Sequence, residues 1–196
     1  MTIFPTSYFG PISYYKDLVS EQEQLIEIHE TYQKQTIRNR MEILTSNGVR
    51  SLTVPIIKPF GNKTVTKDIQ IANAENWQKT HWRSIESAYK HAPFFEHYEE
   101  EVKSLIFYKT SHLFELNEKI IDTIIQWLQL PIDKKFTKTF EKTPEKHYRN
   151  GETDHPYKKE YRYIQVFGIP SDFTPNLSIL DPLFNLGPMT RTILMH

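Results

Sequence analysis

The sequence predicts an α/β fold of 196 residues in a single domain, with a mixed β-sheet in a strand-rich first third. Alternating apolar and polar residues, typical of strands, recur over the first 71 residues. From residue 74 the apolar residues repeat with helical spacing instead. With 38% hydrophobic residues, a chain of this length can bury roughly 70% of its unfolded surface. A succession of strands and helices of this kind favours the α/β class.

The first third carries short strands and one helix. Pro11 stands where a helix can begin, and Ile12, Tyr15 and Leu18 then share one face. Asn47-Gly48 between two apolar runs is typical of a β-hairpin whose loop is two residues or longer. The predicted elements are an extended segment over 3–8, a helix from Pro11, a strand over 25–29, hairpin strands over 41–44 and 52–56, and a strand over 65–71.

Three apolar stripes at helical spacing predict a helical segment of about three helices, with Pro93 at the first break. The stripes are Trp77, His81, Ile85, Ala88 and Tyr89; then Phe95, Tyr98, Val102, Leu105 and Ile106; then Leu113, Leu116, Ile120, Ile124, Trp127 and Leu128. Residues 132–160 are polar and rich in lysine, which predicts an exposed charged loop with one short strand. We expect this loop to be a candidate lid.

A C-terminal strand over 161–167 and a short final helix complete the prediction. Ser178 and Asp181 have the spacing of an acidic capping box. Alternatively, Asp181 caps a shorter helix that opens with Pro182. Gly187 and the proline after it mark the end of the helix.

Composition excludes several classes of chemistry. The chain has no cysteine, which rules out disulfides, thiolate nucleophiles and zinc held by cysteine. Its 24 basic and 24 acidic residues balance, so we expect no binding to nucleic acid and no general attraction to an anionic membrane. No apolar run approaches the roughly 18 residues that span a bilayer, and no signal peptide is evident, so we expect a cytoplasmic protein without membrane insertion. His91 and His97 lie on opposite sides of a predicted break, so we expect no metal site.

Lys34, Arg38 and Arg40 concentrate positive charge at the edge of an apolar element, with Asn39 between the two arginines. Guanidinium groups suit bidentate capture of carboxylate or phosphate, so the cluster predicts a site for a small anionic substrate. The alternative is that Arg38 and Arg40 only share a solvated strand face.

His81 is the candidate catalytic residue, because its helical stripe turns it inward and a neutral imidazole can move a proton. A core histidine bonded to backbone is the alternative. Arg83 projects elsewhere. His29 and Glu30 end a predicted strand, where α/β sheets often place ligand-binding groups; a surface pair is equally compatible.

Two further patterns bear on binding. Asp181 and Asn185 are one helical turn apart and could face a site together, although a capping role also accounts for Asp181. Residues 4–11 form an extended segment, a turn with glycine and a helix start, an arrangement that can place backbone N–H groups against phosphate. A simple turn is the alternative.

Several motifs, taken in order, resemble the WbqC-like family. They are residues 32–40, Asn47-Gly48, Leu52-Thr53-Val54-Pro55, His81-Trp82-Arg83, Tyr89 with Pro93-Phe94-Phe95, residues 177–181 and Phe184-Asn185-Leu186-Gly187-Pro188. The resemblance covers most of the chain and is weakest over 132–160.

The resemblance implies a transferase of bacterial surface-polysaccharide (O-antigen-like) or amino-sugar biosynthesis, with amino-acyl (glycyl) transfer to a sugar as one suggested reaction. It places His81, Arg83 and Tyr89 in the family's helix motif without assigning their roles. The alternative is a non-catalytic protein that binds an anionic glycan precursor or nucleotide. The sequence identifies no cofactor and no oligomeric state. From all these patterns we expect one cleft lined by Lys34, Arg38, Asn39, Arg40, His81, Tyr89 and Asn185.

Overall fold

The computed structural model describes residues 1–73, 76–149, 162–167 and 173–195. A four-stranded parallel sheet forms one part of the molecule, in the order β7-β2-β1-β8. Its inner strands, β1 (Thr2–Pro5) and β2 (Gln24–Glu27), are joined by helix α1 (Ile12–Ser20). Its edge strands, β7 (Lys135–Phe136) and β8 (Lys146–His147), come from much later in the chain.

Two antiparallel ribbons complete the strands. The hairpin of β3 (Arg40–Thr45) and β4 (Gly48–Thr53) is paired from Arg40↔Thr53 to Thr45↔Gly48, so its loop is Ser46-Asn47. Gly48, the first residue of β4, has a φ of +94°, a conformation that favours glycine. The second ribbon pairs β5 (Ile56–Ile57) with β6 (Gln70–Ile71).

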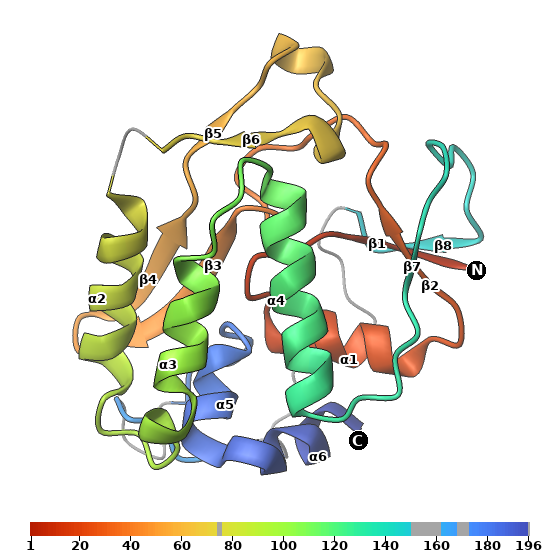
Figure 1. The fold of residues 1–196 in the computed structure, drawn as a ribbon. Coiled ribbons are helices and arrows are strands. Elements are labelled where there is room, and N and C mark those ends of the chain that lie inside the picture. Colours follow the sequence, from red (N-terminus) through yellow and green to blue (C-terminus); the bar gives the residue numbers. More distant parts are fainter. Residues whose placement is uncertain (74–75, 150–161, 168–172, 196) are drawn as a thin grey trace.

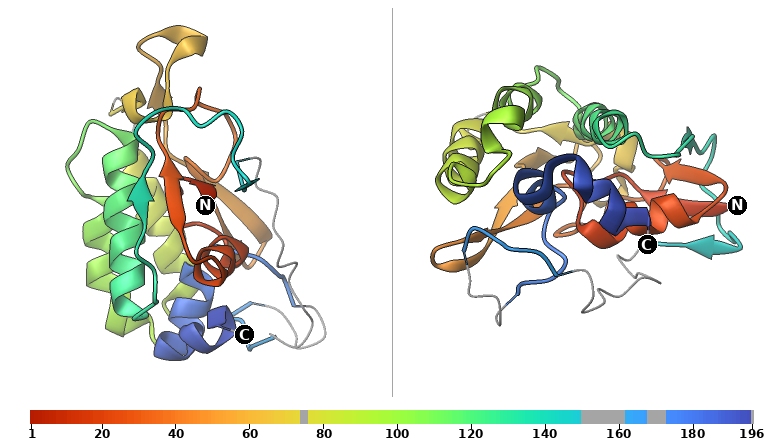
Figure 2. Two further views of the ribbon diagram at one scale, coloured as in Figure 1. Left: turned by 90° about the vertical axis from the view of Figure 1, so that its right-hand side faces the viewer. Right: turned by 90° about the horizontal axis from the view of Figure 1, so that it is seen from below.

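Helices α2 (Trp77–Tyr89), α3 (Phe95–Ile106) and α4 (Leu113–Trp127) lie side by side along one side of the molecule (Figures 1 and 2). Their apolar stripes face inward and are buried apart from the half-buried Trp127, which confirms the three predicted helices. The chain ends with α5 (Leu180–Leu186) and α6 (Thr190–Met195), and α6 packs against α1. No helix in the described part of the chain has the length and apolar content needed to cross a membrane.

The α/β class is confirmed, but several element predictions were wrong. Only residues 70 and 71 of the predicted strand 65–71 are a strand, because Val65 makes a single antiparallel bridge with Thr31 and the chain then turns in the 3₁₀ helix Thr66–Asp68. Residues 162–167 contain no strand, and residue 161 lies outside the described residues. Two short strands, not one, lie in the described part of segment 132–160, and residues 150–160 are outside it.

The start of α5 keeps one bond of the predicted capping box, since Leu180 N donates to Ser178 Oγ at 3.3 Å, but Ser178 N does not donate to Asp181 in return. The Ser178 backbone N–H donates to the Glu42 carbonyl at 2.8 Å, and the Ser178 hydroxyl donates to the Phe9 carbonyl at 2.8 Å. Asp181 lies inside the helix, one residue after its first residue, and Pro182 is accommodated in the first turn. Ser178 therefore connects α5 to the β1–α1 loop and to β3.

Candidate functional site

Arg38 lies in the segment that links β2 to β3 and is fully buried, and its guanidinium group is paired with a carboxylate of the protein itself. Arg38 Nε donates to Glu30 Oε1 at 2.9 Å, and Arg38 Nη2 donates to the same oxygen. Arg38 Nη1 donates to Thr36 Oγ1 at 3.1 Å. The carboxylate capture expected of a guanidinium is thus present, with Glu30 as the acceptor. Capture of a substrate by Arg38 stays a prediction.

Glu30 belongs to a buried charge network at the carboxyl end of β2, where the parallel sheet presents its strand ends. Arg149 Nη2 donates to Glu27 Oε2 at 2.9 Å, and Arg149 Nε lies 3.8 Å from Glu30 Oε2. Arg38 Nη2 donates to the Arg149 carbonyl at 3.0 Å. Burial raises the pKa of Glu30, and the positive charge of Arg38 opposes that rise. The network ties residue 149 to the end of β2.

This network corrects the expectation of a uniformly exposed loop over 132–160. Arg149 is buried, and the Lys134 side chain is 7% exposed because it pairs with Glu118 and with Asp122 Oδ1 at 2.9 Å. The described part of the segment is therefore anchored at two points by buried cations. A lid role for this segment stays a prediction.

Asn39, Lys34 and Arg40 have three different environments. Asn39 Nδ2 donates to the Val54 carbonyl at 2.9 Å and fixes the entry into β3, while Asn39 Oδ1 is buried without a partner. Lys34 is exposed. Arg40 is half-buried, and its Nε is buried without a hydrogen-bond partner. No ion pair joins Arg40 to a carboxylate within the ranges that the structure describes.

Arg38 and Arg40 line one cavity of about 330 Å³. The cavity lies between the first turns of α1, the segment before β3 and the residue after β8. Its lining is Phe4, Pro11, Ser13, Tyr14, Asp17, Gln35, Thr36, Ile37, Arg38, Arg40, Met41, Glu42, Tyr148, Asn176 and Ser178. Its volume is at the lower end of the range for small-molecule sites, roughly 300–1,000 Å³. The guanidinium groups of Arg38 and Arg40, the carboxylates of Asp17 and Glu42, and hydroxyl and amide groups converge there.

The β1–α1 loop leads into this cavity, but the N–H groups at the start of α1 are already occupied. Ile12 N donates to the Leu177 carbonyl at 3.0 Å, and Ser13 N donates to Asn176 Oδ1 at 2.9 Å. The loop needs a glycine for packing, because a Cβ on Gly10 would lie 2.5 Å from Ser7 Oγ. The loop therefore shapes the wall of the cavity.

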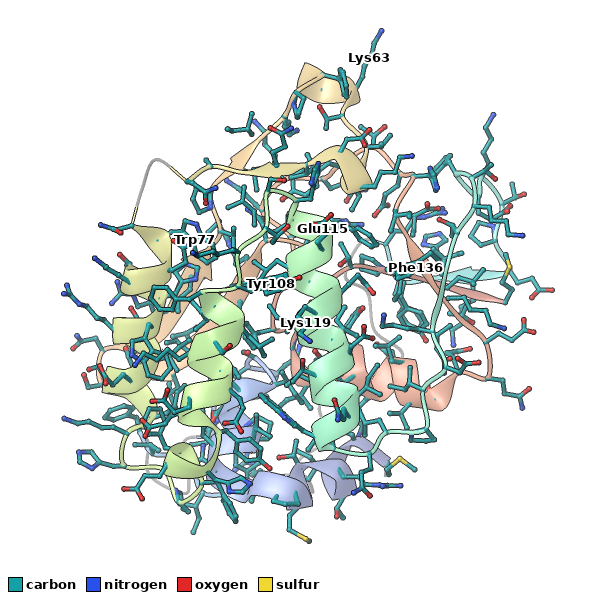
Figure 3. All side chains as sticks on the ribbon, in the orientation of Figure 1. Lys63, Trp77, Tyr108, Glu115, Lys119 and Phe136 are labelled. Atoms are coloured by element: carbon teal, nitrogen blue, oxygen red, sulfur yellow. The ribbon has the colours of Figure 1, made fainter. Side chains whose placement is uncertain are left out.

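His81 is a buried histidine with two hydrogen-bonding neighbours. Its Nδ1 lies 2.9 Å from the Tyr8 hydroxyl, and the backbone of Thr53 supplies the second bond. Burial lowers the pKa of His81 to about 4, so the ring is neutral at cellular pH. Thr53 pairs with Arg40 across the hairpin, yet His81 lines a separate pocket of about 220 Å³ beside Trp77, which Figure 3 labels at the start of α2.

The remaining predicted residues lie elsewhere. Arg83 is exposed and lines a shallow depression between α2 and α3. Tyr89 is buried against Phe184, and its hydroxyl accepts a 3.4 Å hydrogen bond from Leu44 N. Asp181 and Asn185 are buried together in α5, with Asn185 Nδ2 3.1 Å from Asp181 Oδ1.

Asp181 is a buried carboxyl with amide partners. Gln165 Nε2 donates to Asp181 Oδ2 at 3.1 Å, opposite the amide of Asn185. Burial raises the pKa of Asp181 to about 7, and these hydrogen bonds oppose that rise only in part. Asp181 and Asn185 thus interact through their carboxyl and amide groups, as their spacing suggested, but inside the protein core.

Among the described residues, the predicted cleft is divided between separate places. Arg38 and Arg40 share the cavity at α1, His81 lines a second pocket, and Tyr89 and Asn185 lie in the core. Sequence analysis missed Asp17, which lines the cavity although it is 2% exposed. The sequence pattern did not indicate that Asp17 is buried, because α1 is a short amphipathic helix. The only available signal was that Asp17 lies one helical turn after Ser13.

These features define an α/β protein with a small polar cavity beside the carboxyl ends of parallel strands. The family model of the WbqC-like protein family matches residues 6–155, three quarters of the sequence. The chain belongs to the WbqC-like protein family. The C-terminal motifs from residue 177 onward lie outside the matched range.

The chain is also similar to an uncharacterized protein of Mycobacterium tuberculosis (strain ATCC 25618 / H37Rv), Rv1507c. The two are 25% identical over 217 aligned positions, which cover 92% of this chain and 91% of the relative. No solved structure matches the chain.

Proposed function

We propose that the protein is a cytoplasmic transferase of bacterial surface-polysaccharide (O-antigen-like) or amino-sugar biosynthesis. Its substrate is a sugar derivative bearing phosphate or carboxylate, bound in the cavity beside α1. Amino-acyl (glycyl) transfer to the sugar is the reaction to test first. Family membership supports the biosynthetic setting, and the cavity supports the class of substrate.

The observation that carries this proposal is the buried, unpartnered Nε of Arg40 at the cavity wall. A guanidinium donor removed from water without an acceptor costs free energy, so native proteins nearly always supply a partner. Arg38 nearby is already neutralised by Glu30. Arg40 is therefore the cation that a bound anion would satisfy, and its planar fork suits carboxylate or phosphate oxygens.

The rest of the cavity wall suits a sugar. Ser13, Thr36 and Asn176 bring hydroxyl and amide groups to the lining, and Phe4 and Tyr14 bring aromatic rings. Sugars combine hydroxyl groups with apolar ring faces, so such a mixed wall matches both parts of the ligand. The volume of about 330 Å³ corresponds to one small moiety rather than to a complete nucleotide sugar.

A non-catalytic protein that binds the same anionic precursor is the second candidate. It is favoured by the position of His81, which is buried, engaged with Tyr8 and Thr53, and lines a pocket other than the proposed substrate cavity. The cavity lining includes no histidine among the described residues. A carrier or sensor of the precursor needs only the binding groups.

The first experiment tests Arg40. Nucleotide sugars, sugar phosphates and activated amino acids are incubated with the protein, with binding followed by calorimetry and products by mass spectrometry. Arg40→Lys should weaken binding by about 1 to 3 kcal/mol, roughly 5- to 150-fold, because an ammonium cannot make the bidentate contact. Arg191→Lys in α6 is the matched control and should bind normally. Equal affinity of the Arg40 variant and the parent protein would refute the proposed site.

His81→Asn separates the two candidate functions, provided that its circular dichroism and urea unfolding show a folded protein. A transferase that uses His81 as a base loses turnover while ligand binding stays near that of the parent. A binding protein shows affinity without turnover in both forms. A folded variant that retains full turnover excludes His81 from the chemistry.

A further inference from the structure

Residues 56–71 form an arm that extends beyond the helices and the parallel sheet (Figures 1 and 2). The arm consists of β5, two single 3₁₀ turns at Gly61–Lys63 and Thr66–Asp68, and β6. It lies apart from the cavity, whose lining includes none of its residues. A function of the arm is therefore independent of the proposed substrate site.

The arm exposes both apolar and basic side chains. Phe60 is 66% exposed and Ile57 is 49% exposed. The arm carries Lys58, Lys63 and Lys67 against one carboxylate, that of Asp68. In Figure 3 the Lys63 side chain extends outward at the far end of the arm. Positive charge is thus local here, although the whole chain is formally neutral.

The exposure of Phe60 is fixed by hydrogen bonds within the arm. Phe60 N donates to Thr64 Oγ1 at 2.9 Å, and the same hydroxyl donates to the Gly61 carbonyl at 2.9 Å. Gly61 has a φ of +56°, a conformation that favours glycine, and Thr64 is 1% exposed. The base is fixed as well, because Tyr32 N donates to the Thr64 carbonyl at 3.0 Å. Exposure of the Phe60 ring to water is unfavourable, so a ring held outward in this way indicates a surface that contacts another molecule.

We propose that the arm docks on the surface of an anionic lipid bilayer. Phe60 and Ile57 enter the headgroup region, and the exposed Lys63 and Lys67 contact lipid phosphates, whereas Lys58 is half-buried with its Nζ 5.4 Å from the centroid of the Tyr32 ring. A stable protein–protein interface buries on the order of 800 Å² on each partner, more than an arm with two large exposed apolar side chains offers. A bilayer needs only a few apolar side chains beside cations, since each lysine near an anionic surface adds attraction of its own. The contact is peripheral, and no part of the arm crosses the bilayer.

Co-sedimentation of the protein with vesicles tests the proposal. The protein should bind vesicles of phosphatidylcholine mixed with phosphatidylglycerol, bind phosphatidylcholine alone much more weakly, and dissociate in high salt. Phe60→Ser should weaken binding about tenfold, because the largest apolar contact is lost. Lys63→Gln with Lys67→Gln should weaken it roughly 25-fold, at about fivefold for each lysine.

The controls are Phe107→Ser and Lys119→Gln, which remove an exposed aromatic ring at the end of α3 and an exposed lysine on α4. Both controls should bind like the parent protein. The proposal is overturned if the parent fails to bind anionic vesicles, if it binds neutral vesicles equally, or if the control variants lose as much binding as the arm variants.

Discussion

Replacing Asp181 by Asn should make the stability of the protein less dependent on pH. Burial raises the pKa of the Asp181 carboxyl from its ordinary 3.8 to about 7 in the folded state. Between these two values the folded protein holds a proton that the unfolded chain releases, so stability falls as pH rises. At about 1.4 kcal/mol for each pH unit, the parent should lose roughly 2.5 kcal/mol between about pH 5 and about pH 8 through this group alone.

The assay is urea unfolding of the parent and of Asp181→Asn at several pH values, with the difference in unfolding free energy between the two proteins as the measured quantity. Taking the difference cancels all other titrating groups, including His81. Asn in place of Asp turns an amide toward Gln165 Nε2, which costs about 1 to 3 kcal/mol at every pH. This constant cost does not affect the slope.

The unfolding free energy of the variant, relative to that of the parent, should therefore increase by roughly 2.5 kcal/mol as pH rises from about 5 to about 8. A difference that stays constant across this range would show that Asp181 is ionised in the folded protein. Its position between two amides would then be a charged site, and a binding role for Asp181 and Asn185 would regain support.

The remaining predictions concern buried ionisable groups. The stability contributed by neutral His81 is present above its ordinary pKa of 6.5 and is lost as pH falls through its folded-state pKa of about 4. The parent should therefore lose roughly 2 kcal/mol of unfolding free energy between about pH 8 and about pH 5 through this group, and His81→Asn should not show that loss. An unchanged pH profile of urea unfolding in the variant would contradict this. Glu30→Gln leaves the Arg38 guanidinium buried without its carboxylate and should cost about 3 to 5 kcal/mol in the same assay. Glu23→Gln, on an exposed side chain, should cost under about 0.5 kcal/mol, and equal effects at both positions would exclude a special role for the buried pair.

The helical part of the fold could be predicted because helical spacing depends on local burial. Each stripe in α2, α3 and α4 is long enough to be distinguished from a strand, and each is buried as expected. The hairpin was predictable for the same reason, since Asn47-Gly48 specifies the turn locally. The prediction of a strand over 65–71 was wrong for most of its length, because the alternation of apolar and polar residues there has another origin. Ile69 is buried at the end of the 3₁₀ turn Thr66–Asp68, and only Ile71 is buried within a ladder, opposite Ile56 of β5.

The site was predictable only as far as its composition. The segment 34–40 does hold the cations of the cavity, and Arg38 does hold a carboxylate. Which carboxylate it holds could not be inferred, because the network joins residues 8 and 111 positions apart in sequence. Arg149 was interpreted as part of a solvated loop for the same reason. Partner choice among charges depends on the tertiary fold, which local patterns do not encode.

The late origin of β7 and β8 has a consequence for synthesis of the protein on the ribosome. Thr2 and Ile3 in β1 pair with residues 146 and 147, and β2 pairs with residues 135 and 136. Until these residues leave the exit tunnel, both outer edges of the β1–β2 pair have free backbone N–H and C=O groups. Such long-range pairing slows folding and leaves a nascent chain open to mispairing. Chains stopped before residue 135 should therefore accumulate as insoluble or chaperone-bound species, even though α1 and the hairpin are already complete.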